Sequence, residues 1–227
     1  MQDIKRIKRD FDLINKNMIQ EDDWNHNIHY HDYLLRFVPT NCQFAVDIGC
    51  GTGEFARKLA IKSSEVYGFD VSTITINKAI EFSQSYPNIT YFAQDVLTYP
   101  FQDESIDCFS SLAVLHHIDL HNLLPKLKKA LKPGGTIIFL DLYHQSSFRD
   151  FLPDFLAIPL NKYYLKTKPQ RKQTQEEILA MQEHMKHDKY LSKKELKDIY
   201  GTYLPNYQFK IHLFWRYSLI WKKSISN

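Results

Sequence analysis

Hydrophobic runs of strand length alternate with helix-like segments through the middle of the chain. The runs predict β-strands at residues 44–48, 65–69, 89–93, 106–111 and 136–142. The segments between them have apolar residues at helical spacing and predict helices at residues 55–60, 73–85 and 120–131. Because the connections are short, this order predicts an α/β fold with a doubly wound parallel sheet, right-handed crossovers and helices on both faces.

The regions on either side of this core have different patterns. Residues 1–40 place apolar side chains on one helical face and predict a helical cap. After residue 143 no strand pattern appears for about 60 residues, and helices are expected at residues 146–155, 173–186 and 192–203. Residues 207–222 alternate like a hairpin. The predicted division is a cap at 1–40, a core at 41–143 and 206–227, and a helical lid at 144–205.

Composition narrows the class of protein without naming a function. The 227 residues suffice for one α/β domain with an accessory region, and the formal net charge of +3 does not by itself imply a polyanionic partner. Three cysteines without C-x-x-C spacing (Cys42, Cys50 and Cys108) argue against a disulfide framework or a zinc site. With a charged N-terminus and no apolar run of membrane-spanning length, a soluble cytoplasmic protein is expected.

A glycine turn follows the first predicted strand, and it is the main candidate for chemistry. Three of the seven glycines lie at Gly49, Gly51 and Gly53, directly after the run that contains Asp47. A dinucleotide is disfavoured because the spacing is G-x-G-x-G and because Asp47 would repel a pyrophosphate. S-adenosylmethionine suits this charge, since it carries an ammonium, a carboxylate and a sulfonium.

Two further aspartates follow the next two predicted strands. Asp70 is placed to accept hydrogen bonds from both ribose hydroxyls, and Asp95 to accept one from an adenine amino group. An aspartate after a strand also commonly caps a helix, which is the structural alternative for each of them. Their register with the glycine turn favours one crevice at the carboxyl ends of three strands.

These segments resemble the sequence motifs of class I S-adenosylmethionine-dependent methyltransferases, in particular the small-molecule, type 11-like branch. Residues 46–53 resemble the first motif, and residues 68–72, 93–96 and 131–135 resemble later ones. The resemblance implies a Rossmann-like seven-stranded sheet whose last strand is antiparallel, with residues 209–221 forming strands six and seven. It also implies S-adenosyl-L-methionine as cofactor, bound through Asp47, Gly49, Cys50, Gly51, Gly53, Asp70, Val71, Asp95, Val96 and Leu112.

Methyl transfer is an in-line displacement, so the protein mainly supplies alignment and a dry pocket. His117 is where related small-molecule enzymes have a histidine; it is a candidate base with a near-neutral pKa, or alternatively a structural histidine. Tyr30 or His31 is expected to contact the cofactor, and His116 to face solvent. No metal site is expected, because Ala113 and His116 stand where metal-assisted quinone O-methyltransferases carry glutamates.

The acceptor is narrowed by exclusion. Ser110-Ser111-Leu112-Ala113 replaces the Asn/Asp-Pro-Pro-aromatic motif of enzymes that methylate exocyclic amines of nucleic acid bases, so a small organic acceptor is favoured and DNA is not expected. Two alternatives stay open: methylation of an anionic lipid or RNA, and a non-catalytic cofactor-binding regulatory module. The first rests on a predicted basic linker at residues 161–172 with Lys162, Lys166, Lys168, Arg171 and Lys172.

Overall fold

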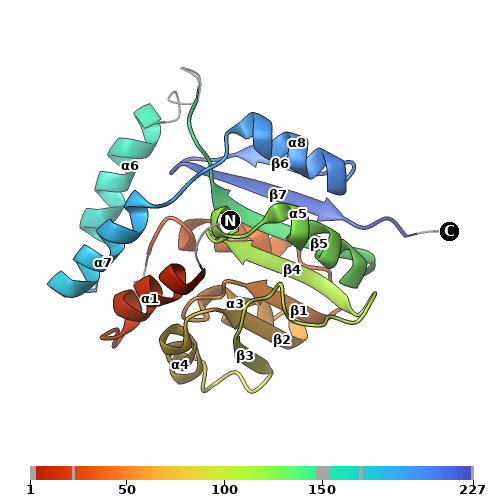
Figure 1. Ribbon diagram of the computed structural model, residues 1–227, viewed down its shortest axis with the longest axis horizontal. Helices are drawn as coiled ribbons and strands as arrows, with labels where there is room; N and C mark the ends of the chain where they lie inside the picture. Colours follow the sequence, from red (N-terminus) through yellow and green to blue (C-terminus); the bar gives the residue numbers. More distant parts are fainter. Residues whose placement is uncertain (1–3, 22–23, 147–153, 169–170, 226–227) are drawn as a thin grey trace.

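The structure is a computed structural model that describes residues 4–21, 24–146, 154–168 and 171–225. Its centre is a seven-stranded sheet in the order β3-β2-β1-β4-β5-β7-β6 (Figure 1). The strands are β1 (Cys42–Ile48), β2 (Ser63–Asp70), β3 (Ile89–Ala93), β4 (Ile106–Leu112), β5 (Leu131–Leu142), β6 (Gln208–Ile211) and β7 (Arg216–Lys222). β7 pairs antiparallel with both β5 and β6, and the pairs among β1 to β5 are parallel. The predicted Rossmann-like sheet with its antiparallel last strand is confirmed.

The helices also follow the predicted order, with two corrections. They are α1 (Ile4–Asn15), α2 (His31–Leu34), α3 (Glu54–Ala60), α4 (Thr73–Phe82), α5 (Leu120–Ala130), α6 (Asp154–Thr167), α7 (Gln175–Lys186) and α8 (Lys193–Tyr203). The helix expected at 146–155 is wrong at its start, since residue 146 is not helical, and residues 147–153 lie outside the described residues. The predicted linker at 161–172 is wrong in its first half, which forms the end of α6.

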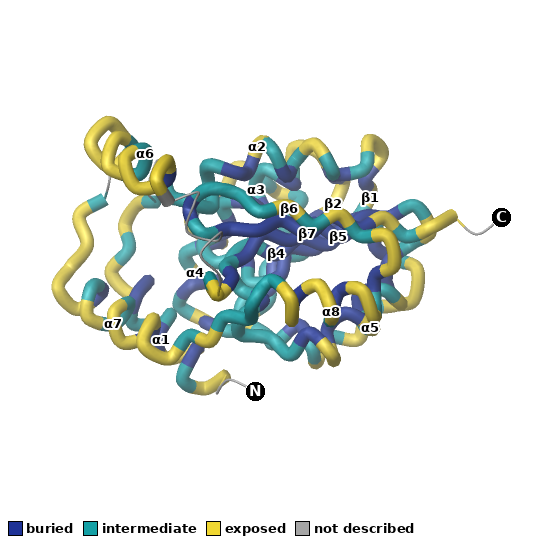
Figure 2. Tube along the Cα trace, turned by 90° about the horizontal axis from the view of Figure 1, so that it is seen from above, coloured by how far each residue is buried: buried dark blue, intermediate teal, exposed yellow. Residues whose placement is uncertain are grey.

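Successive residues along the strands face opposite sides of the sheet, so each face has its own core. Val46, Phe109 and Phe139 pack on the side of α5 and α8. Ala45 and Ile138 pack on the other side, with α3 and Leu34 of α2. Figure 2 shows the buried strands between these two layers of helices. The three-layer arrangement brings the carboxyl ends of β1, β2 and β3 to one edge of the sheet.

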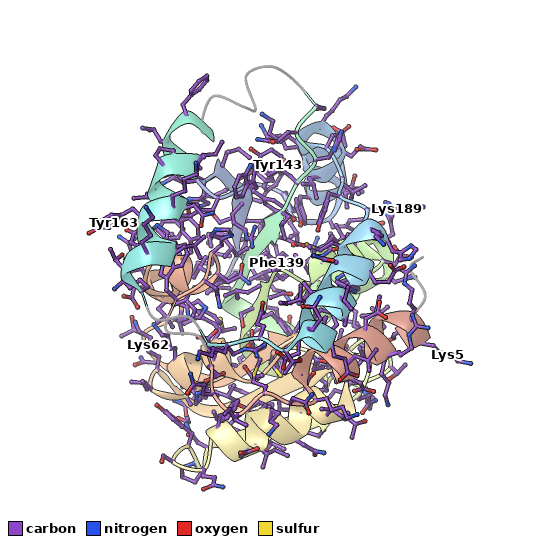
Figure 3. The ribbon with its side chains drawn as sticks, turned by 90° about the vertical axis from the view of Figure 1, so that its left-hand side faces the viewer. Lys5, Lys62, Phe139, Tyr143, Tyr163 and Lys189 are labelled. Atoms are coloured by element: carbon purple, nitrogen blue, oxygen red, sulfur yellow. The ribbon has the colours of Figure 1, made fainter. Side chains whose placement is uncertain are left out.

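The helices α1, α6 and α7 stand beyond the sheet, on the opposite side of the molecule from the C-terminus (Figure 1). Figure 3 looks onto this side, where Tyr163 lies at the outer edge of α6 and Phe139 of β5 lies inside. α1 packs against α7 and α4, so the cap and part of the lid form one wall. No helix among the described residues is both long and apolar enough to cross a membrane.

Helix α8 falls within the predicted lid, but its packing is that of a core helix. Leu196 is 3% exposed and Tyr200 is fully buried against the sheet, where the hydroxyl of Tyr200 lies 2.7 Å from that of Tyr217 on β7. The capping box at Ser192 and Glu195 fixes the start of this helix. Of the segment 144–205, α6 and α7 therefore cover the strand ends, and α8 packs on the sheet.

We expect replacement of Leu196 by alanine to lower the free energy of unfolding by about 2–4 kcal/mol, because it empties a filled position in the core. Leu179→Ala on α7 is the matched control; this leucine is 54% exposed, and the change is expected to stay within about 0.5 kcal/mol. Urea unfolding followed by circular dichroism measures both. Equal effects of the two substitutions would contradict the assignment of α8 to the core.

Candidate active site

The turn after β1 is built from three glycines with left-handed backbone. Gly49, Gly51 and Gly53 have φ values of +64°, +53° and +86°, a region that side chains disfavour. Gly49 also has no space for a side chain, since a Cβ atom would lie 2.3 Å from Val114 Cγ2, whereas a Cβ on Gly51 would meet nothing within 4 Å. The turn therefore packs against the β4 end at Gly49 and leaves open space at Gly51.

Asp47 is buried at the end of β1, beside the turn. It is 2% exposed, and the hydroxyl of Ser110 on β4 donates to its Oδ1 atom at 2.6 Å. Burial raises the pKa of Asp47 to about 7, and the negative charge of Asp70 acts in the same direction. Both effects penalise a buried anion, so a cation bound in the adjacent space would stabilise the ionised form.

Asp70 at the end of β2 is held by backbone amides. The amide of Gly51 donates to Oδ2 at 3.2 Å and the amide of Ser72 donates to Oδ1 at 2.9 Å. Burial nevertheless raises the pKa of Asp70 to about 6, against the lowering effect of these two hydrogen bonds. Asp95, after β3, accepts a hydrogen bond from the amide of Leu97 at 2.9 Å, so the structural alternative of a local turn holds for this oxygen.

These three carboxylates line one cavity of about 370 Å³, which lies at the carboxyl ends of the strands. Its size falls within the roughly 300–1,000 Å³ of small-molecule sites. It lies where the order of the sheet reverses between β1 and β4, the place at which open α/β sheets bind ligands. The predicted site residues that line it are Asp47, Gly49, Cys50, Gly51, Asp70, Val71, Asp95, Val96, Leu112, His31 and His117.

Two predicted site residues lie elsewhere. Gly53 belongs to the turn, but a Cβ atom there would face Tyr91, away from the cavity. Tyr30 donates its hydroxyl hydrogen bond to the carbonyl of Leu213 at 2.9 Å and packs in the aromatic cluster beside the hairpin. The expected cofactor contact of Tyr30 therefore has no support in this geometry, because its polar atom is engaged by the backbone.

His31 is 2% exposed, and burial lowers its pKa to about 3, with a further lowering by Lys58. Its Nδ1 atom is buried without a hydrogen-bond partner among the described residues, although the ring lines the cavity. A neutral imidazole with an unpaired nitrogen at the wall of a cavity is suited to accept or donate one hydrogen bond to a bound molecule.

His117 also lines the cavity, but its environment differs from the predicted one. Burial lowers the pKa of His117 to about 2, and the neighbouring His116, His184 and Arg6 lower it further. The expected near-neutral pKa is therefore wrong, because burial removes water from the ring and the nearby His116, His184 and Arg6 disfavour a further positive charge. The expected exposure of His116 is also wrong: its side chain is 6% exposed, and Nδ1 lies 2.7 Å from Asp141 Oδ1.

The wall opposite the carboxylates comes from the cap and the lid. Apolar side chains of α1 and one of α7 face the cavity: Ile4, Ile7, Phe11, Ile14 and Met181. The segment after α1 is tied to the turn by Glu21, which accepts a hydrogen bond from Thr52 Oγ1 at 2.5 Å and pairs with Arg57. The cap therefore closes the cavity over the strand ends and is fastened to the glycine turn.

Several cavity residues carry no signal in the sequence. Glu54 lines the wall, and burial together with Glu21 raises its pKa to about 7. Arg171, predicted as a solvated linker residue, lines the cavity with a side chain 6% exposed and pairs with Glu177 at 2.9 Å. The one local signal was the capping box of α7 formed by Thr174 and Glu177, because it fixes the carboxylate that holds Arg171.

The sequence of the α/β core is similar to that of known methyltransferases. The model of a methyltransferase domain family matches residues 46–139. An uncharacterised methyltransferase of Mycobacterium bovis is 34% identical over 115 residues, 50% of this chain and 58% of that protein. A 2-phytyl-1,4-naphtoquinone methyltransferase of Nostoc punctiforme is 30% identical over 131 residues, 52% of this chain and 57% of that protein. The chain thus spans less than two thirds of these relatives.

The fold matches a solved structure over nearly its whole length. A SAM-dependent methyltransferase from Aquifex aeolicus superposes with a TM-score of 0.57 at 15% identity, over 96% of this chain and 96% of that one. The sheet order is that of a Rossmann-like fold shared with this methyltransferase. The match at residues 46–139, the curated relatives and the fold together support a class I S-adenosylmethionine-dependent methyltransferase, with S-adenosylmethionine as the cofactor.

We expect Gly49→Ala to lower the free energy of unfolding by about 2–5 kcal/mol, because a strained φ and a clash with Val114 add together. Gly51→Ala has a similar φ and no clash, so a loss of about 1–2 kcal/mol is expected. Thermal and urea unfolding of the pair isolates the contact. Equal losses would show that the close packing at Gly49 contributes nothing.

Proposed function

We propose that this protein transfers the methyl group of S-adenosylmethionine to a small, largely apolar acceptor. The observation that carries the proposal is the two-sided cavity, which has buried carboxylates at the strand ends and an apolar wall from α1 and α7 opposite them. The first side suits a cationic cofactor, and the second suits an organic molecule without charge. The quinone named for the Nostoc relative is an acceptor of this kind.

In the proposed complex, the amino-acid part of the cofactor lies beside Asp47 and the glycine turn. Its ammonium group offsets the buried charge that raises the pKa of Asp47. The ribose hydroxyls donate to Asp70, whose orientation is fixed by two backbone amides. The adenine lies near Asp95 and Val96, which line the same cavity. The open space at Gly51 leaves room for this approach.

The chemical step needs alignment more than acid–base chemistry. The acceptor atom must lie in line with the methyl carbon and the sulfur to which this carbon is bonded. A closed apolar wall keeps water away from the methyl group. His117 is too weak a base in this environment to take a proton efficiently, since its pKa is about 2. His117 and the unpaired Nδ1 of His31 are suited to orienting the acceptor or the cofactor by hydrogen bonds.

A second candidate, an acceptor at a lipid surface, is favoured by α6. This helix exposes Phe155, Leu156 and Leu165 at 77%, 67% and 49%, next to Lys162 and Lys166. Apolar side chains beside lysines on one exposed helix suit an anionic lipid surface. The same helix gives less support to RNA as the acceptor. The ring of Tyr164 is stacked on Trp24, with the ring centroids 4.8 Å apart, so this face is not available to stack on a base.

We expect cofactor affinity to fall as pH falls, because the cation binds the ionised carboxylates. From pH 7.5 to pH 5.5, protonation of Asp47 and Asp70 with pKa values of about 7 and 6 weakens binding by about 10- to 100-fold. Since both folded-state values lie above the unfolded ones, the free protein loses stability as pH rises through 6 to 7. Calorimetric titration and thermal unfolding across this range measure the two trends.

Asp47→Asn should weaken binding at pH 7.5 and flatten much of the pH dependence, because the amide does not titrate. Asp103→Asn is the matched control, since Asp103 is an exposed carboxylate far from the cavity lining. An unchanged pH profile in Asp47→Asn would contradict the role given to this residue. Absence of any S-adenosylmethionine binding by the wild-type protein would contradict the proposed function itself.

The acceptor class is tested with methyl-labelled S-adenosylmethionine and cell extract separated into small molecules, lipids and RNA. We expect the label in a small molecule one methylene heavier than its precursor, and Met181→Trp to reduce turnover about tenfold or more by filling the apolar wall. Met185→Trp, on the exposed face of α7, is the control and should leave turnover unchanged. Label in the lipid fraction would support the second candidate, and label in RNA or in no fraction would contradict both.

A further inference from the structure

A cluster of metal-ligating side chains lies beside the cavity, apart from the carboxylates assigned to the cofactor. His116, His117 and Asp188 each offer one ligand atom, and these atoms all lie within 4.8 Å of one another. The side chains are 6%, 6% and 4% exposed. The histidines follow β4, and Asp188 follows the end of α7, directly before Lys189, which Figure 3 labels. The lid and the core thus meet at this cluster.

His116 is oriented as a metal-binding histidine is. Its Nδ1 atom lies 2.7 Å from Asp141 Oδ1, and its Nε2 atom lies 4.0 Å from Asp188 Oδ2. When Nδ1 carries the proton and donates it to Asp141, the lone pair is on Nε2, directed toward Asp188. A carboxylate behind the ring fixes the tautomer in this way in zinc sites.

Asp188 supplies the second, independent observation. The hydroxyl of Tyr190 donates to its Oδ2 atom at 2.9 Å, whereas its Oδ1 atom is buried without a hydrogen-bond partner among the described residues. Two imidazoles face this oxygen, with His184 Nε2 at 3.5 Å and His117 Nδ1 at 3.9 Å. A buried carboxylate oxygen without a hydrogen bond lowers the stability of the folded protein. A cation bound between this oxygen and the imidazoles would compensate for the missing interaction.

His184 repeats the arrangement of His116. It lies one helical turn before Asp188, is 4% exposed, and its Nδ1 atom lies 3.3 Å from Asp10 Oδ2 of α1. Its Nε2 atom is thereby directed at the same Asp188 oxygen. Two imidazoles backed by carboxylates, a third imidazole and one carboxylate make a four-ligand set of nitrogen and oxygen.

The local charge also favours a cation. Besides Asp188 itself, two buried carboxylates lie next to the cluster, namely those of Asp10 and Asp141. Two cations act against them, Arg6 at His117 and the buried Arg216 at His116, and Arg9 engages only the other oxygen of Asp10. Tetrahedral zinc with bonds of about 2.0–2.1 Å needs ligand atoms about 3.4 Å apart, so the separations of 3.5 Å to 4.8 Å between these groups have to shorten by up to about 1.4 Å.

We propose that His116, His117, His184 and Asp188 bind one divalent transition-metal ion of the zinc type. The sequence predicted no metal here because the glutamates of the metal-assisted pattern are missing. The structure brings a carboxylate from Asp188 instead, about 70 residues further along the chain. An ion at this position joins α1, α7 and the end of β4 and holds the cap closed against the His117 side of the cavity.

The test uses the full chain after treatment with a chelator, with Zn²⁺ and Co²⁺ as the probes. We expect one zinc per chain, visible absorption bands of four-coordinate cobalt, and a higher melting temperature in the presence of zinc. Asp188→Ala and His184→Gln should each weaken zinc binding by more than about 100-fold. Asp141→Asn should weaken it by about 10- to 100-fold, as loss of a carboxylate behind a ligand does.

His187→Gln is the matched control, because this exposed histidine lies on the same helix end and pairs with Glu183 outside the cluster. It should bind zinc like the wild type. Because Asp188 Oδ1 makes no hydrogen bond, Asp188→Ala is expected to fold, and circular dichroism checks it. Zinc binding that is absent in the wild type, or equal in Asp188→Ala and the wild type, overturns the proposal. Neither result bears on cofactor binding at Asp47, which is measured separately.

Discussion

The candidate site, and the arrangement of the elements around it, is built on two carboxylates buried at one edge of the sheet. Parallel pairing of β1 with β2 brings the ends of both strands together, so Asp47 and Asp70 share one enclosed space behind the glycine turn. Burial alone would drive both to their neutral forms, and their pKa values are raised accordingly. Ser110 and the amides of Gly51 and Ser72 stabilise the anions in part. The part of this charge that remains uncompensated would favour the uptake of a cationic ligand, as proposed for S-adenosylmethionine.

The sheet and these aspartates could be predicted because their signals are local. Apolar runs separated by helical periods fix the strands, and each strand end fixes the position of its carboxylate. The glycines marked the turn, since left-handed backbone at Gly49 and Gly51 needs residues without a side chain. The burial of Arg171, in the second half of the predicted linker, could not be predicted in this way. It results from pairing with Glu177 and from facing the cavity.

The rest of the site is built from contacts distant in sequence. The apolar face of α1 was visible as a helical pattern, but nothing local shows that it packs on α7 to close a cavity. His117 was identified as a site residue, whereas its low pKa arises first from burial and then from His116 and from His184, which lies on another helix. The sequence around His116 predicts an exposed side chain. In the structure the ring is buried, with Asp141 and Asp188 next to it. These charged groups come together only in the folded protein. The hydrophobic periodicity of the sequence therefore does not indicate their contacts.

Buried carboxylates thus lie on both sides of the His117 imidazole, and both sides lack positive charge. At the strand ends, Asp47 and Asp70 are short of positive charge, and an organic cation offsets this only while it is bound. On the far side of His117, Asp188 is short of the same charge, and the proposed metal ion would offset it continuously. Because the second cluster joins the cap and the lid, an ion bound there would hold the apolar wall in place before the cofactor arrives. Under this proposal, closure of the site and binding within it depend on separate charges, and each could change without the other.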